Sequence, residues 1–70
     1  MSAVKQLVQE QYEKMGLANK KTDWETKQMA LESRCQNIVY NEWGVGTQEL
    51  WDSIKEHVEE LIPSIYEEEE

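Results

Sequence analysis

Three stretches of this chain repeat apolar residues at steps of three and four, and a glycine or a proline ends each stretch. Such spacing places one apolar stripe along each of three amphipathic helices. No segment alternates polar and apolar residues over the length of a strand. The 70 residues are therefore predicted to form an all-α fold, a small three-helix antiparallel bundle.

The apolar stripes set the helix ranges, and the first two helices are followed by glycines suited to a left-handed ending, Gly16 and Gly44. The predicted helices cover residues 3–15, 23–43 and 48–62 of a domain that spans residues 1–66. The acidic run at residues 67–70 is expected to be a disordered tail.

Capping residues support these ranges. Ser2 is expected to cap the first helix and Thr47 the third. Thr22 and Glu25 match the capping-box pattern at the start of the second helix. Pro63 disfavours helix at the residue before it, so the third helix should end there.

The three stripes supply the candidate core, and only Gln28 interrupts the second of them. The stripe residues are Val4, Leu7, Val8, Tyr12, Met15, Trp24, Leu31, Cys35, Ile38, Val39, Leu50, Trp51, Ile54, Val58, Leu61 and Ile62. A core of this size gives a domain of 70 residues thin stability. A partner or a second copy would add to that stability, so a homodimer is one expectation.

The charge is divided unequally between the two halves of the chain. Residues 1–35 carry six basic and five acidic residues, whereas residues 36–70 carry one basic and ten acidic residues. Charge of that density serves solubility, exclusion of nucleic acid or attraction of a basic partner. It argues against direct binding to nucleic acid or to an anionic membrane surface.

The chain shows no sign of export or membrane insertion. No apolar run approaches the roughly 20 residues of a membrane-spanning helix. The single cysteine, Cys35, has no internal partner for a disulfide, and the N-terminus lacks an apolar signal region. The expected location is the cytoplasm.

Catalysis is not expected, because the nucleophile and base required for it do not come together in the sequence. Cys35 lies on an apolar stripe, where a thiol acts as a small hydrophobe, and His57 flanks the stripe of the third helix. The sequence contains none of the familiar metal, phosphate or dinucleotide motifs. We therefore expect neither enzyme activity nor a metal or cofactor.

An acidic row on the third helix is the most specific signal in the sequence. Its members recur at steps of three and four opposite the apolar stripe: Glu49, Asp52, Glu56, Glu59 and Glu60. Glu42 and the acidic tail would extend the row into a continuous anionic strip. Two interpretations remain open: a surface that occupies a basic groove of a partner, or an ordinary solvated helix face.

Two aromatic residues near the end of the second helix form a second candidate surface. Tyr40 and Trp43 lie one turn apart beside the Gly44 break. Exposed aromatic residues of this kind anchor interfaces. The alternative is a purely structural role, in which the two rings cover the end of the core. Basic residues of the first half, Arg34 among them, are expected to pair with the acidic third helix within the bundle or across a head-to-tail dimer.

In size, charge and helicity the chain resembles the small acidic inhibitors, DNA mimics among them, that phages and mobile elements make against host nucleic-acid enzymes. This resemblance rests on composition and assigns no residue. It implies a non-catalytic protein that binds and inhibits or modulates a basic partner that handles nucleic acid. The alternative is a self-associating helical module, structural or adaptor, whose charge serves only solubility.

Overall fold

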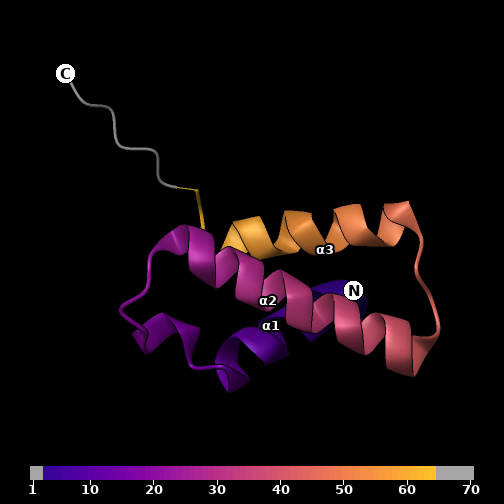
Figure 1. Cartoon of the computed structure of the whole chain (residues 1–70), viewed down its shortest axis with the longest axis horizontal. Helices are drawn as coiled ribbons and strands as arrows, with labels where there is room; N and C mark the ends of the chain where they lie inside the picture. The colour runs from indigo at the N-terminus through magenta and orange to yellow at the C-terminus, as the bar shows by residue number, and fades with distance from the viewer. Residues whose placement is uncertain (1–2, 65–70) are drawn as a thin grey trace.

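The computed structural model describes residues 3–64 and shows three helices packed against one another. They are α1 (Ala3–Lys14), α2 (Trp24–Ile38) and α3 (Gln48–Leu61). Successive helices run in opposite directions, and the residues described contain no strand (Figure 1). The all-α, three-helix prediction is confirmed. The predicted cap Ser2 and the acidic tail lie outside the described residues.

The turn between α1 and α2 is built on Gly16. Its φ of 65° lies in the left-handed region, as the sequence predicts for the residue that ends α1. The chain then makes a short 3-10 helix, Leu17–Asn19, where only a linker was expected. Leu17 is almost fully buried there, so the turn contributes to the core.

The predicted capping box at the start of α2 is wrong. The helix begins at Trp24, which makes Asp23 the N-cap residue, and no side chain caps the helix there. Thr22 precedes the N-cap by one residue, so its hydroxyl is out of register with the first free amides of the helix.

The second helical segment ends at Trp43 as predicted, but the regular α-helix stops at Ile38 and the last turn is wider than expected. Val39–Trp43 form a π-helical turn that continues α2 up to Gly44. The carbonyl of Val39 accepts hydrogen bonds from the amides of Gly44 and Val45. Gly44 has a φ of 71°, which confirms the predicted left-handed ending.

The third helix begins where predicted and, like the first, ends one residue before its predicted end. Thr47 is the N-cap, and its hydroxyl accepts a hydrogen bond from the amide of Leu50 at 3.3 Å. Ile62 is the C-cap residue, one position before Pro63.

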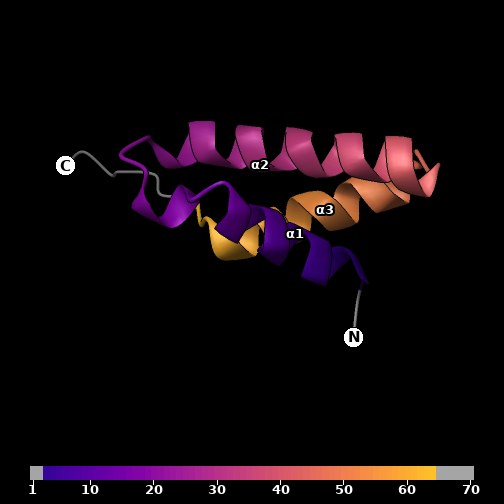
Figure 2. The same cartoon turned by 90° about the horizontal axis from the view of Figure 1, so that it is seen from below.

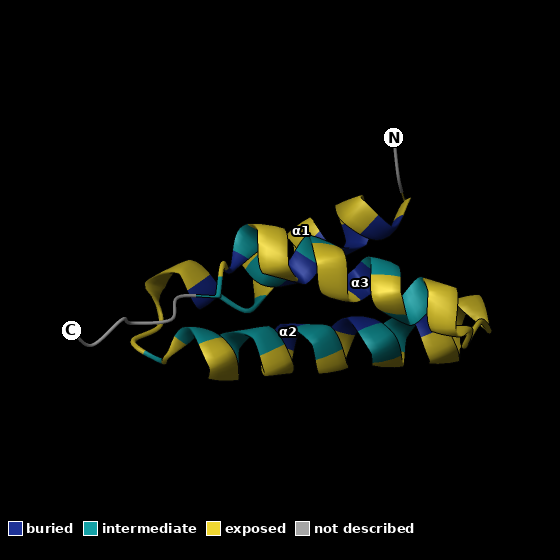
Figure 3. Cartoon of the chain, turned by 90° about the horizontal axis from the view of Figure 1, so that it is seen from above, coloured by how far each residue is buried: buried dark blue, intermediate teal, exposed yellow. Residues whose placement is uncertain are grey.

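The core lies between the three helices, and its buried apolar residues come from every helix and from the first turn (Figure 3). They are Val4, Leu7, Val8, Leu17, Leu31, Cys35, Val39, Ile54, Val58 and Ile62. Trp24 and Trp51 are only partly buried and pack against this cluster rather than filling it. The two large indoles therefore border the core, which is smaller than the stripes predicted.

Gln28 has a role in the fold that its place on an apolar stripe left unexplained. Its side-chain amide donates hydrogen bonds to the carbonyl of Ile62 and to the hydroxyl of Ser64. These bonds join α2 to the segment that follows α3.

The packing of the helices is not uniform along the bundle. The first turns of α1 lie farther from α2 than its last turns do, as two views from opposite sides show (Figures 2 and 3). A groove lies between α1 and α2, and none of its lining residues belongs to α3.

Candidate functional site

The outer face of α3 carries the acidic row predicted from the sequence. The stripe of α3 packs toward α1 and α2 through Ile54 and Val58, so the residues opposite it face solvent. The acidic face is defined here by five exposed side chains: Glu49, Asp52, Glu56, Glu59 and Glu60. The prediction that they share one exposed side of the helix is confirmed.

Several polar neighbours shape the acidic face. The side-chain amide of Gln48 donates to a carboxylate oxygen of Asp52 at 3.0 Å. Nδ1 of His57 lies 3.4 Å from Oε1 of Glu60. Lys55 lies beside Asp52, Glu56 and Glu59 around a shallow depression, and it is the one Lys or Arg residue of α3. The helix keeps a net charge of −4 when His57 is neutral.

The predicted extension of the acidic row through Glu42 is wrong. Glu42 belongs to the π-helical turn and lines the groove between α1 and α2, with Leu7 and Ile38 among its neighbours there. The wider turn changes the direction of its side chain relative to a regular helix. The acidic face is therefore confined to α3 within the described residues.

Tyr40 and Trp43 are both exposed, which agrees with the interface interpretation rather than with coverage of the core, but they belong to two surfaces. Trp43, 42 % exposed, lines the groove between α1 and α2. Tyr40, 67 % exposed, lies against Gly46, whose other neighbour is the indole of Trp51. Each residue of a π-helical turn rotates the chain about the helix axis by a smaller angle than a residue of an α-helix does. Two residues three positions apart therefore point in more different directions, and the two rings do not share a face.

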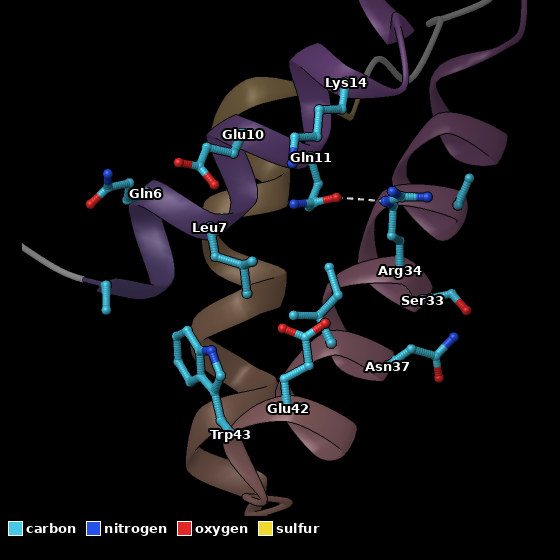
Figure 4. Close-up of a pocket in the computed structure, with 13 residues that line it drawn as sticks. Gln6, Leu7, Glu10, Gln11, Lys14, Ser33, Arg34, Asn37, Glu42 and Trp43 are labelled. Atoms are coloured by element: carbon cyan, nitrogen blue, oxygen red, sulfur yellow. Dashed lines mark hydrogen bonds between the residues drawn. The ribbon is translucent and has the colours of Figure 1, made fainter.

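A groove between α1 and α2 was not predicted. It has a volume of about 900 Å³. Lys14 lies at one end, Glu42 and Trp43 lie at the other, and Leu7 lies between them (Figure 4). Its α2 wall has mostly small or polar side chains: Ala30, Ser33, Arg34 and Asn37.

Arg34 and Gln11 join the two walls of this groove. Nε of Arg34 donates a hydrogen bond to Oε1 of Gln11, a buried side chain of α1 (Figure 4). The sequence prediction that Arg34 pairs with the acidic third helix within the bundle is therefore wrong. The buried amide of Gln11 offers Arg34 a nearer acceptor than the outward carboxylates of α3 do.

Cys35 is fully buried and lies in the core cluster. Burial raises the pKa of its thiol to about 11 against an opposing effect of the Arg34 charge, so the thiol stays protonated at neutral pH. A protonated, enclosed thiol is a poor nucleophile and a poor metal ligand. Residues 3–64 contain no group of three acidic, histidine or cysteine side chains placed to hold a metal ion.

Comparison with known proteins gives no relative: no family model, curated protein or solved structure matches the chain. Over the residues described, no helix has the length and apolar character to cross a membrane. Functional inference therefore depends on the acidic face and the α1–α2 groove.

Proposed function

We propose that this protein is a non-catalytic interaction protein that binds a basic, nucleic-acid-handling protein through the acidic face of α3. The observation that carries the proposal is the exposure of all five carboxylates on one side of a single helix. Asp52 accepts a hydrogen bond from the neutral amide of Gln48, and Glu60 lies 3.4 Å from His57. Since α3 keeps a net charge of −4 when His57 is neutral, the acidic face offers negative charge to a partner.

The spacing of the acidic face supports a partner that normally binds nucleic acid. Steps of three and four residues along a helix separate the carboxylates by about 4.5–6 Å along the axis. Phosphates of one DNA strand are separated by about 3.4 Å of axial rise. A groove whose Lys and Arg residues follow phosphates would therefore meet negative charge at a comparable, though not identical, interval.

The test reverses charge on the acidic face without touching the core. Immobilised wild-type protein is used to capture basic proteins from a lysate of the encoding organism at about 0.1 M and about 1 M salt. We expect capture at the lower salt only, and loss of capture in the double variant Asp52→Lys with Glu56→Lys. The matched control, Glu13→Lys with Glu25→Lys, changes the same charge on exposed sites of α1 and α2 and should keep capture.

A competition assay then examines the nucleic-acid aspect of the proposal. The captured partner is loaded with labelled DNA or RNA and titrated with wild-type protein at low salt. Wild type should displace the nucleic acid and the Asp52→Lys, Glu56→Lys variant should not. Equal capture by that variant, or failure of wild type to displace the nucleic acid, contradicts the proposal.

The alternative function, a self-associating helical module, is favoured by a separate observation. Trp43 is 42 % exposed in a groove that has no occupant from the described part of the chain. The two functions use different sides of the bundle, so they do not exclude each other.

A further inference from the structure

The α1–α2 groove offers apolar surface next to small side chains of α2. Trp43 supplies apolar surface at one end of the groove (Figure 4), and the half-buried Ile38 also lines it. Ala30 and Ser33 are exposed on the α2 wall, and small side chains such as these let a second helix approach closely.

The charges in the groove have opposite signs at its two ends. One end holds Lys14 and Arg34 together with Glu10, and the other end holds Glu42 (Figure 4). The first end therefore has a net charge of +1 and the second a net charge of −1. Nε of Arg34 is bonded to Gln11, and its terminal nitrogens make no hydrogen bond to another described residue.

Two pairs of groove-lining residues, from α2 and from the π-helical turn that continues it, are equally distant in sequence from Ile38. Arg34 precedes Ile38 by four residues and Glu42 follows it by four. Ser33 precedes it by five residues and Trp43 follows it by five. Arg34 is thus matched by Glu42 at the same separation in sequence, and the small Ser33 is matched by the large Trp43.

We propose that two copies of this chain pair through their α1–α2 grooves, with the two helical segments formed by α2 and its π-helical turn running antiparallel and crossing near Ile38. Each α2 then lies in the groove of the other copy. Arg34 faces the partner's Glu42, and Trp43 packs over the partner's Ser33. The arrangement is isologous, so each contact occurs twice.

A second copy explains the groove better than a helix of an unrelated protein does. A helix of another protein would bind here if its own charges were opposite to those at the two ends of the groove. Such binding would not require Arg34 and Glu42 to be equally distant from one residue of this chain. A two-fold axis requires that matching. Pairing would also add buried apolar surface to a domain in which ten of the described residues are buried and apolar.

The test is a charge exchange between the two ends of the groove, followed by sedimentation equilibrium at low ionic strength. Wild type is expected to sediment at twice 8.3 kDa at high concentration, with a melting temperature that rises with concentration. The variant R34E has an acidic residue at both position 34 and position 42, and the variant E42R has a basic residue at both. Each should weaken the dimer by about tenfold or more, because like charges then face each other.

Mixing the two single variants separates an interface effect from a folding effect. R34E removes the hydrogen bond to Gln11, so its monomer is less stable whatever the interface is. In a one-to-one mixture both contacts are again between opposite charges. The mixture should therefore form a heterodimer more tightly than either variant forms a homodimer. Lost stability of a monomer cannot produce that result.

Two matched controls locate the interface. E59R makes the same change of charge as E42R on the far side of the bundle and should leave the dimer intact. Trp43→Ala should weaken the dimer, whereas Tyr40→Ala removes a more exposed ring that does not line the groove and should not weaken it.

Three results would overturn the proposal: a monomeric wild type at millimolar concentration, no preferential heterodimer in the mixture, or equal disruption by E59R and E42R. The last result would place self-association on α3. A monomer that instead binds a peptide or partner helix in the groove would assign the groove to a foreign occupant.

Discussion

Removal of the Gln28 side chain tests whether polar bonds hold α3 against α2. The amide of Gln28 makes one hydrogen bond to the carbonyl of Ile62 and one to the hydroxyl of Ser64. A hydrogen bond within a protein contributes roughly 0.5–1.5 kcal/mol to the free energy of unfolding. Gln28→Ala should therefore lower that free energy by about 1–3 kcal/mol, offset by a few tenths through the higher helix propensity of alanine.

The chain offers a matched control for this substitution. Gln36 is also on α2 and also partly buried, but its side chain makes no hydrogen bond to another described residue. Gln36→Ala should change the free energy of unfolding by no more than about 0.5 kcal/mol. Urea unfolding followed by circular dichroism at one fixed protein concentration measures both variants, so that any dimerisation affects them equally.

A double-mutant cycle with Ser64 divides the effect between the two bonds. If the bond to the Ser64 hydroxyl contributes, Gln28→Ala should cost less in a Ser64→Ala background than in wild type, by about 0.5–1.5 kcal/mol. The remainder belongs to the carbonyl of Ile62. If Gln28→Ala and Gln36→Ala lower the free energy of unfolding equally, the two bonds do not stabilise the fold and the reasoning is refuted.

Two further predictions concern the core. Leu31 is fully buried, so Leu31→Ala should lower the free energy of unfolding by about 2–5 kcal/mol, and loss of the helical circular dichroism signal at 25 °C would be consistent with a domain this small. If the free energy of unfolding of Leu31→Ala lies within about 1 kcal/mol of the wild-type value, the site collapses around the smaller side chain. The pKa of Cys35 is raised from 9.0 to about 11 in the folded state, so the unfolded state releases the thiol proton first. The contribution of this thiol to the free energy of unfolding is fully present below pH 9. It should decrease as the pH rises toward 11, by up to roughly 1.4 kcal/mol per pH unit. Cys35→Ala should lack this part of the pH dependence when urea unfolding is compared between the two chains at pH 8 and about pH 10.5; identical pH dependence would contradict the assignment.

The helices and their ends were predictable where a single residue determines the local backbone. Gly16 and Gly44 adopt the left-handed conformation that a helix ending requires, and Thr47 caps α3 through its own hydroxyl. The capping box at Thr22 failed because the start of a helix is uncertain by a residue or two from pattern alone. The hydroxyl of Thr22 lies one residue before the N-cap, so it is not in position to accept a hydrogen bond from the first free amides of the helix.

The two glutamines on the apolar stripes show where sequence reasoning was incomplete. Gln11 lies at helical spacing between Val8 and Met15, as Gln28 does between Trp24 and Leu31. Both side chains bond to a different helix or to the segment after it. A polar residue at a stripe position needs a partner when it is buried, so its presence was a usable signal of contact between helices. The identity of that partner depends on packing, which the pattern does not contain.

The acidic face was predictable and the groove was not, for one physical reason. The face lies on one helix, so helical periodicity alone brings its residues together. The groove depends on the divergence of α1 from α2 and on the π-helical turn that turns Glu42 and Trp43 toward it. Both features arise from how separate segments pack.

The two proposals together predict how the acidic faces would be arranged in an assembly. Because α3 lies behind the α1–α2 groove, pairing through the groove leaves both acidic faces exposed on the outside of the dimer (Figure 4). A dimer with two such faces binds a partner that has two basic sites with an avidity that one face lacks. E42R should then still capture the basic partner but release it faster than wild type does. The Asp52→Lys, Glu56→Lys variant should form dimers and capture nothing, so each proposal can fail while the other stands.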